Sequence, residues 1–417
     1  MRRALNGAVK SFSNTSFKVG DRFHGFVLNQ CKPISVYDMT YYKFIHEKIK
    51  SQYFHINSGR EEKTFAIMFR TPPIDDTGTS HILERLIAYG AKKFPVRNLF
   101  KNMKDRSLST YMNGWIGPDF TIYVFSSTNN KDMLNLLSLY SEAIFFPLLR
   151  YEDFLQEAHR IQSDQLNRLY RTGNTYNEMK NRLLDPNEYF TIRLLQNLFQ
   201  SSPYKFNSSG DPLFIPDLTY EKLIDYHKSF YHPSNAYFFS FGNIDFTPYL
   251  ETIEKDVMSQ FKELSKINTQ ISREPQNTNQ VRIITEKFMP DENRPITHQG
   301  IYAVSRLCNE SYSDPYKTFA LKILAKLLLD GSNSPMYKAL IESKLGDSYC
   351  PAIGYDASFR DSLFTLGVQG CLCEQTHFHH IDNAIFNTLQ QAKDTKFSED
   401  DFNRVIQEIT YNTVIFL

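Results

Sequence analysis

Three residues in one short segment could perform metal chemistry: His81, Glu84 and Arg85, in the run His-Ile-Leu-Glu-Arg over 81–85. In the zinc-binding pattern His-x-x-Glu-His, two histidines four positions apart share one helical face and hold the ion, while the glutamate is the general base. Here an arginine stands in place of the second histidine. A guanidinium stays protonated and has no lone pair, so Arg85 cannot ligate zinc. The segment therefore predicts a metal site that lacks one ligand.

Taken alone, a His-x-x-Glu pair also fits polar residues on a solvated helix. The neighbouring sequence favours the metal interpretation. Residues 63–69 predict a strand, residues 71–78 form a turn rich in Pro, Asp and Gly, and the helix that carries His81 follows. Further strands at 107–113 and 120–125 and a helix over 132–146 continue the series. This order would present His81 at the entry of a helix beside a sheet.

With these elements in place, the chain resembles the pitrilysin or insulinase-type metallopeptidases, and within them the presequence-protease subgroup. The resemblance runs from Val19 to beyond Gly370. Its most specific segments are His81–Arg85, Arg106–Asn113, Thr128–Asp132, Tyr140–Leu148, Asn177–Lys180, Gly210–Pro212, Tyr231–Ala236 and Ser334–Ser343. So many matches in one order leave little room for coincidence.

The resemblance implies a role for each residue of the candidate metal site. The family's third zinc ligand is the glutamate of an Asn-Glu-Met-Lys segment, which is Glu178 in this chain. His81 and Glu178 would then be zinc ligands, Glu84 the general base, and Arg85 the occupant of the missing ligand position. Zn²⁺ is the cofactor that the resemblance implies. We expect Arg85 to replace the ion electrostatically by pairing with Glu84 or Glu178 in one buried charge cluster.

The resemblance also implies a surface that binds peptides. The family adds an extended substrate strand to a sheet edge through main-chain hydrogen bonds. By resemblance, the edge residues here are Ser109, Thr110, Tyr111 and Asn113. Trp115, Phe120 and Tyr123 could line side-chain pockets nearby or could be ordinary core residues.

Composition excludes several other functions. The 47 basic and 46 acidic residues give a formal net charge of +1, which provides no field suited to nucleic acid. Five cysteines without a Cys-x-x-Cys pair predict neither a disulfide framework nor a cysteine zinc site. No apolar run approaches the roughly 20 residues needed to cross a bilayer, so we expect no transmembrane segment. His377, His379 and His380 fit a solvated helix start better than a metal site.

The N-terminal residues 1–20 have the composition of a mitochondrial transit segment. Arg2, Arg3, Lys10 and Lys18 precede the first acidic residue, Asp21, and serines are frequent. Leu5, Ala8, Val9 and Phe12 would share one helical face. We therefore expect a mitochondrial matrix location, with a disordered basic tail as the alternative.

The segment order predicts an α+β fold of two tandem α/β rolls, each an antiparallel-rich sheet with helices on one face. The first would span residues 21–265, a polar linker residues 266–280, and a second unit without metal residues 281–417. Its predicted elements are strands at 300–304, 353–357 and 362–370 and helices at 316–329, 335–345 and 379–392. By resemblance, these two rolls correspond to the N-terminal half of a four-roll protein.

Two functions from different classes remain open. One is a zinc-dependent metalloendopeptidase acting on short unfolded peptides, such as cleaved mitochondrial targeting sequences, with a site impaired by Arg85. The other is a catalytically inactive peptide-binding or regulatory subunit, which Arg85 favours on mechanism. Under either, a C-terminal half or a catalytic partner chain would be an expected partner.

Overall fold

The computed structural model describes residues 17–263, 268–275 and 281–416, so most of the predicted transit segment lies outside the described residues. A large first sheet has the strand order β1-β2-β3-β4-β10-β5-β7-β6. All its neighbouring strands are antiparallel except β4 and β10. Its strands are β1 Arg22–Phe23, β2 Phe26–Ile34, β3 Met39–His46, β4 Gln52–Asn57, β5 Lys63–Arg70, β6 Ser109–Ile116, β7 Phe120–Ser127 and β10 Ala236–Gly242.

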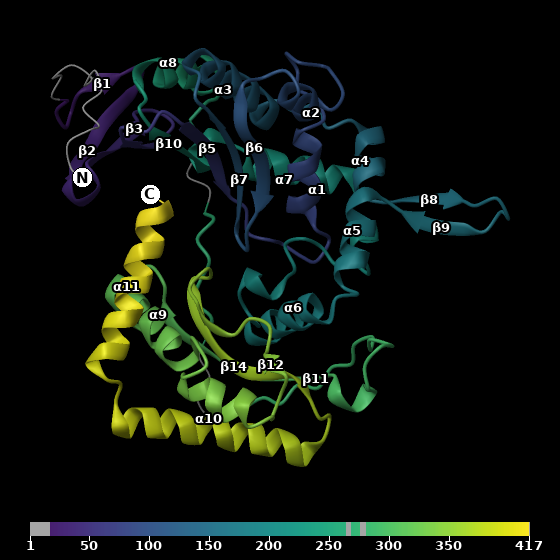
Figure 1. The fold of residues 1–417 in the computed structure, drawn as a ribbon. Helices are drawn as coiled ribbons and strands as arrows, with labels where there is room; N and C mark the ends of the chain where they lie inside the picture. The colour runs from purple at the N-terminus through teal and green to yellow at the C-terminus, as the bar shows by residue number, and fades with distance from the viewer. Residues whose placement is uncertain (1–16, 264–267, 276–280, 417) are drawn as a thin grey trace.

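Helices α3 (Asn130–Phe145) and α8 (Thr247–Asp256) cover one face of this sheet (Figure 1). Asn129 caps α3, because its side-chain oxygen accepts hydrogen bonds from the amides of Lys131 and Asp132, at 3.0 Å each. The covered face is strongly aromatic. Phe44, Tyr53, Phe65, Phe69, Phe125 and Phe238 are fully buried there. Burial of these side chains is the main stabilisation of the first sheet.

A tight turn after β5 leads into α1 (Thr79–Ile87). Gly78, with φ of 68°, occupies the left-handed region just before the helix, where a side chain would be strained. A Cβ there would also lie 2.8 Å from the Cα of Gly210. The turn is therefore locked against the segment around Gly210, and this contact fixes the direction in which α1 leaves the sheet.

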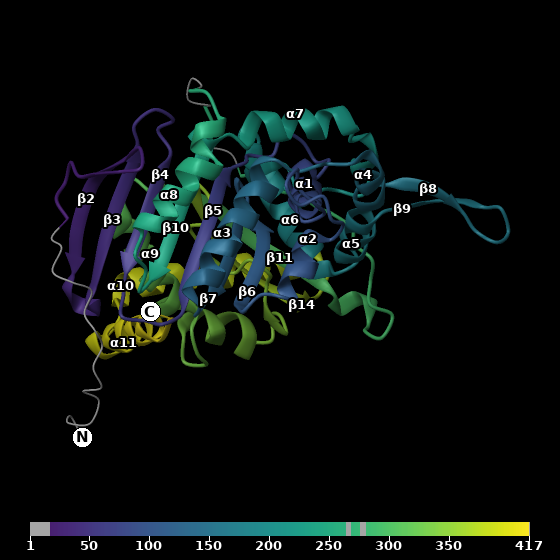
Figure 2. The same ribbon diagram turned by 90° about the horizontal axis from the view of Figure 1, so that it is seen from above.

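Further helices follow in this part of the chain. They are α2 Leu99–Lys104, α4 Tyr151–Glu157, α5 Asn174–Arg182, α6 Pro186–Leu198 and α7 Tyr220–Phe230. Two of them, α4 and α7, pack against α1. Between α4 and α5, strands β8 (Arg160–Ser163) and β9 (Leu169–Thr172) form a two-stranded hairpin that projects from the body (Figure 2). The sequence analysis named neither this hairpin nor the first four strands.

A second, smaller sheet follows the linker. It contains β11 (Gly300–Glu310), β14 (Asp361–Cys371), β12 (Ser348–Tyr349) and β13 (Gly354–Asp356). Its helices are α9 Pro315–Leu329, α10 Gln375–Thr395 and α11 Glu399–Phe416. The predicted helix at 335–345 is instead a π-helical stretch, Tyr337–Glu342. The predicted α+β class with antiparallel-rich sheets is confirmed, whereas the boundaries of the two rolls stay a prediction.

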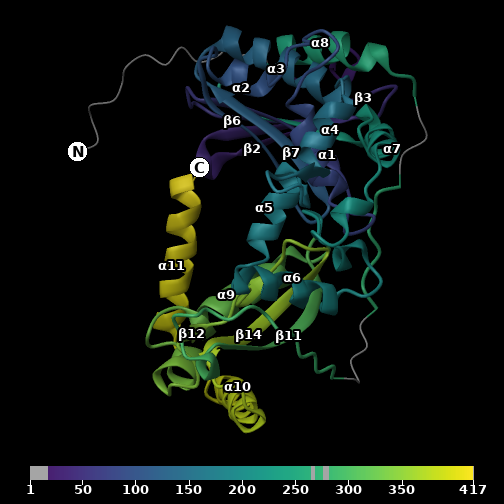
Figure 3. The same ribbon diagram turned by 90° about the vertical axis from the view of Figure 1, so that its right-hand side faces the viewer.

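The described residues 268–275 of the linker contact both parts of the protein. The carboxylate of Glu274 accepts hydrogen bonds from the amides of Gln200, Ser201 and Ser202, at 2.8–3.1 Å. Arg273 Nε donates to Asp361 Oδ1, at the start of β14, over 2.8 Å. Figure 3 shows α3 and α8 on the side of the first sheet away from the second sheet. The other face of the first sheet therefore turns toward the second sheet.

Candidate metal site

Helix α1 presents His81 beside α5. The Nδ1–H of His81 donates to the carbonyl oxygen of Ser209, 3.1 Å away, because a carbonyl can only accept. This fixes the tautomer and leaves Nε2 with a free lone pair. Nε2 lies 3.8 Å from Oε1 of Glu178, so the two predicted ligands are neighbours. Burial, the largest effect, lowers the pKa of His81 and favours the neutral imidazole.

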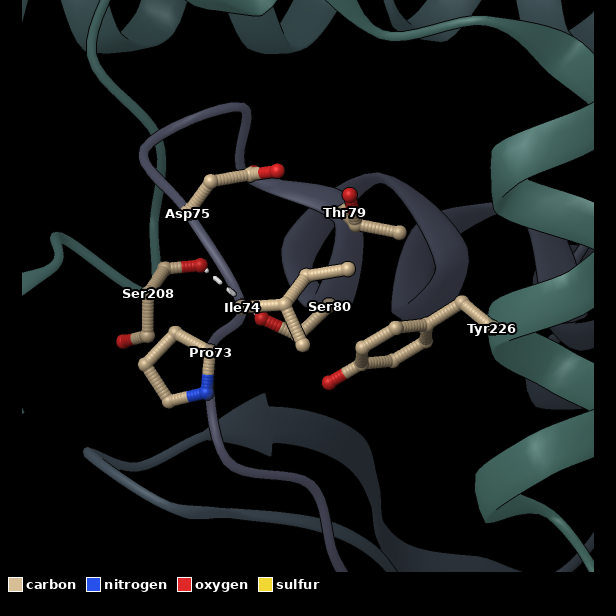
Figure 4. Close-up of a pocket in the computed structure, with 7 residues that line it drawn as sticks. All are labelled: Pro73, Ile74, Asp75, Thr79, Ser80, Ser208 and Tyr226. Atoms are coloured by element: carbon tan, nitrogen blue, oxygen red, sulfur yellow. Dashed lines mark hydrogen bonds between the residues drawn. The ribbon is translucent and has the colours of Figure 1, made fainter. Parts of the chain in front are cut away.

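The first turn of α1 contacts the segment that contains Ser208 (Figure 4). Ser80 Oγ donates to the carbonyl oxygen of Ser208 over 2.9 Å. A small hollow beside this contact is lined by Pro73, Ile74, Asp75, Thr79, Ser80, Ser208 and Tyr226. Asp75 also binds the ammonium of Lys222 from α7. These contacts position His81 independently of any metal.

Arg85 forms two ion pairs that tie α1 to two other helices. Its Nη1 donates to Glu178 Oε2 on α5, and its Nε donates to Glu157 Oε2 on α4, each over 2.7 Å. Glu157 also accepts from Tyr89 Oη and, over 2.6 Å, from Asn174 Nδ2. The Glu157 side chain is only 1% exposed, so its charge depends on these donors.

The predicted pairing of Arg85 with Glu178 is confirmed, but the alternative pairing with Glu84 is not formed. Glu157 was missed by the sequence analysis. Only its position near the end of a helix, without a motif around it, could have drawn attention to it. Arg85 and Glu178 are also 36% and 38% exposed, so the cluster is half-buried rather than fully buried as expected.

Glu84 lies against the edge strand β6. A Cβ on Gly114 of that strand would come within 2.4 Å of Glu84 Oε1, so only glycine leaves room for the carboxyl group. Burial raises the pKa of Glu84 to about 7, with Glu178 and Glu157 adding to the rise and Arg85 opposing it. A carboxyl group that is partly protonated near neutral pH is suited to proton transfer or hydrogen-bond donation.

These residues do not fit a three-ligand zinc site. Across the part of the chain that the structure describes, no group of three His, Cys, Asp or Glu side chains could hold a metal ion. His81 Nε2 and Glu178 Oε1 are two donors, and the second carboxylate oxygen of Glu178 is taken by Arg85. The guanidinium adds a fixed positive charge where a cation would bind.

The predicted peptide-binding residues lie on β6, which ends the strand order and so has a neighbouring strand on one side only. Thr110, Tyr111 and Asn113 are exposed, and Ser109 is half-buried. Thr110 Oγ1 donates to Glu62 Oε1 over 2.5 Å. Trp115 is 41% exposed, but Tyr123 is fully buried in the core and cannot line a pocket. The role of this edge in binding stays a prediction.

His227 and the three histidines of the predicted helix start have structural partners or exposed positions. His227 Nε2 donates to the carbonyl oxygen of Ile144 over 2.9 Å, and burial lowers its pKa to about 4. His377 lies in the first turn of α10 and donates to the carbonyl of Leu345, while His379 and His380 are exposed. Among the described helices, none is long and apolar enough to cross a membrane.

Comparison with known sequences identifies relatives over nearly the whole chain. The mitochondrial presequence protease of Mus musculus is 36% identical over 402 residues, which is 95% of this chain and 38% of the relative. The mitochondrial presequence protease of Schizosaccharomyces pombe is 35% identical over 94% of this chain and 39% of the relative. The chain thus spans less than two-fifths of their length. A family profile described as "Peptidase M16 inactive domain" matches residues 217–409.

Solved structures share the fold. A protease from Helicobacter pylori superposes with a TM-score of 0.66 at 15% identity, covering 90% of this chain and 85% of that one. Pitrilysin superposes with a TM-score of 0.59 at 14% identity, covering 91% of this chain and 39% of that one. At such low identities, these two structures support the architecture and not the chemistry.

Replacing Arg85 by methionine should destabilise the protein by about 2–3 kcal/mol. The change leaves the buried carboxylate of Glu157 without its cation, while the partial exposure of Arg85 limits the loss. Urea denaturation without added zinc measures the effect. Arg182→Met is the matched control, because it removes an exposed pair with Glu188 and should cost less than about 1 kcal/mol. Equal stabilities of the two variants would contradict the assigned network.

Replacing Glu84 by glutamine should change how stability depends on pH. Because the folded-state pKa is raised, ionisation of Glu84 opposes folding, and stability falls as pH rises from the ordinary carboxyl range through about 7. Glu84→Gln should match the parent at about pH 4 and be more stable by roughly 2 kcal/mol at about pH 8.5. Urea midpoints at the two pH values give the comparison, and a constant difference between the proteins would refute the raised pKa.

Proposed function

We propose that this chain, as a member of the pitrilysin-type M16 peptidase family, binds short unfolded peptides without hydrolysing them. The observation that carries the proposal is the pair of contacts from Arg85 to Glu178 and Glu157, each 2.7 Å long. Arg85 thereby occupies one oxygen of the Glu178 carboxylate, which is the group that would have to bind the zinc ion. Without three ligands and an open coordination position, a metal-activated water is not supported.

Peptide binding does not depend on the missing ligand. The edge strand β6 keeps an unpaired side at Ser109, Thr110, Tyr111 and Asn113. A peptide that adds to such an edge is held by main-chain hydrogen bonds, which tolerate many sequences. Gly114 lets Glu84 approach this edge closely. A protonated Glu84 could donate a hydrogen bond to the bound main chain, which would support binding rather than catalysis.

A zinc-dependent endopeptidase is the second candidate. It is favoured by the retention of His81 with a free Nε2 lone pair and of Glu84 with a pKa of about 7. If zinc bound, it would supply an activated water, but the described residues offer only two of the three ligands. Any further part supplied by a C-terminal half or a partner chain is also a proposal, supported by the greater length of the relatives.

We also propose a mitochondrial location. Support comes from relatives that are named mitochondrial and from the basic, acid-free residues 1–20. Residues 1–20 fused to a fluorescent reporter should direct it to mitochondria. Arg2→Glu with Arg3→Glu is the matched control and should abolish import. Diffuse cytosolic fluorescence from the unmodified fusion would remove this assignment.

The proposed function is tested with a labelled unfolded peptide of zero net charge. Fluorescence anisotropy should show saturable binding, and mass spectrometry should show the peptide intact after prolonged incubation with zinc. A peptide N-methylated at alternate residues should bind at least about tenfold more weakly, whereas a scrambled sequence should bind about equally. Chelator-sensitive cleavage would support the endopeptidase instead, and the absence of binding would refute peptide holding.

A further inference from the structure

The face of the first sheet opposite α3 and α8 has an unusual composition. Strand register places one set of side chains on this face, which we call the open face. Its members on the six strands from β3 to β7 and β10 are Met39, Tyr41, Lys43, Ile45, Gln52, Phe54, Ile56, Thr64, Ala66, Met68, Arg70, Tyr111, Asn113, Trp115, Phe120, Ile122, Val124, Ser126, Tyr237, Phe239 and Phe241. These described positions include eight aromatic residues and two cations but no aspartate or glutamate. A further cation, the exposed Lys32 of β2, lies on the same face opposite Tyr41.

The aromatic residues of the open face form a row across three strands. Tyr41 stacks with Phe54 at a centroid distance of 6.3 Å, and Phe54 stacks with Tyr237 at 6.4 Å with an interplanar angle of 9°. All three are half-buried, and none belongs to a core cluster of the described residues. Such rings offer flat apolar surface to a ligand rather than filling the interior.

Two cations, Lys43 and Arg70, lie over these rings. Lys43 Nζ is 5.5 Å from the centroid of Phe54, and the guanidinium carbon of Arg70 is 5.6 Å from that of Tyr237. Neither cation forms a salt bridge among the described residues. The rings hold the side chains in place while their hydrogen-bond donors stay available to an anion.

One carboxyl group near Arg70 needs consideration. Burial raises the pKa of Asp119, and the charge of Arg70 only partly opposes that rise. Asp119 Oδ2 already accepts a hydrogen bond from Tyr204 Oη over 2.9 Å. Asp119 therefore partly offsets the charge of Arg70 without forming an ion pair with it. The open face as a whole remains cationic and aromatic.

Charge complementarity defines the occupant of this face. An extended peptide added to β6 lies at the border of the open face, because Tyr111, Asn113 and Trp115 belong to both. Segments of the peptide beyond the edge can then cross the rings toward Arg70 and Lys43. Acidic side chains would find unpaired cations there, whereas arginine and lysine would meet like charge without a carboxylate partner. Mitochondrial transit peptides are rich in arginine and poor in acidic residues, so the open face should bind them weakly.

We propose that the open face selects acidic peptides that also carry aromatic or large apolar side chains, and that it discriminates against basic targeting peptides. The inference rests on the proposed function, since it names the class of peptide that this protein holds. The peptide class proposed for this chain differs from the presequences that appear in the name of its relatives. Arg70 and Lys43 supply the charge selection, and the row of Tyr41, Phe54 and Tyr237 supplies the apolar contact.

The test uses two labelled peptides of equal length. They share aromatic and apolar positions and differ only in carrying glutamate or lysine at the others. Anisotropy titrations at low salt should show the glutamate peptide binding at least about tenfold more tightly, with the difference shrinking at high salt. Arg70→Gln and Lys43→Gln should each weaken binding of the glutamate peptide by about three- to tenfold.

Lys322→Gln on α9 is the matched control, because it removes an exposed lysine outside the open face and should leave both affinities unchanged. Circular dichroism checks that each variant is folded. Equal binding of the two peptides, tighter binding of the lysine peptide, or an equal effect of Lys322→Gln would overturn the selection while leaving peptide holding intact. If neither peptide binds, the proposed function itself fails, and the selection fails with it.

Discussion

The contact of Arg85 with Glu178 and Glu157 is the interaction on which the candidate site depends. It links α1, α4 and α5 through one guanidinium, with each bond 2.7 Å long. Glu157 is almost completely buried, so a charge there requires a permanent cation nearby. Without this cation, Glu84, Glu157 and Glu178 would lie near one another with no compensating positive charge. Arg85 therefore compensates the site electrostatically as well as occupying it.

The presence of arginine at position 85 affects hydrolysis and peptide binding differently. Zinc-dependent hydrolysis needs three ligands and an open position, and we propose that Arg85 prevents that arrangement. The edge strand depends instead on main-chain geometry and on Gly114, which admits Glu84 beside it. These features lie on the sheet and are supported by the aromatic core under α3. The proposed peptide-binding edge therefore does not depend on a metal at the candidate site.

The sequence predicted the elements around the site better than the contacts within it. The strand at 63–69, the turn with Gly78 and the helix with His81 were predictable because turn residues and hydrophobic alternation mark them locally. Glu157 was not predictable, since its importance comes from the packing of α4 against α1 and leaves no spacing pattern. Tyr123 was named as a possible pocket residue because an aromatic residue on a strand looks the same on either face of a sheet. The composition of the open face emerged only from the register of six strands far apart in sequence.

The central claim is that Arg85 replaces the metal, and zinc content per chain measures it most directly. Protein saturated with zinc and then dialysed should retain well under one zinc per chain, about 0.1 or less, because two donors beside a fixed cation make a weak site. Arg85→His, prepared in parallel, should retain about one zinc per chain, because it completes a three-ligand set with His81 and Glu178. Retention of about one tightly held zinc by the unmodified protein would contradict this account.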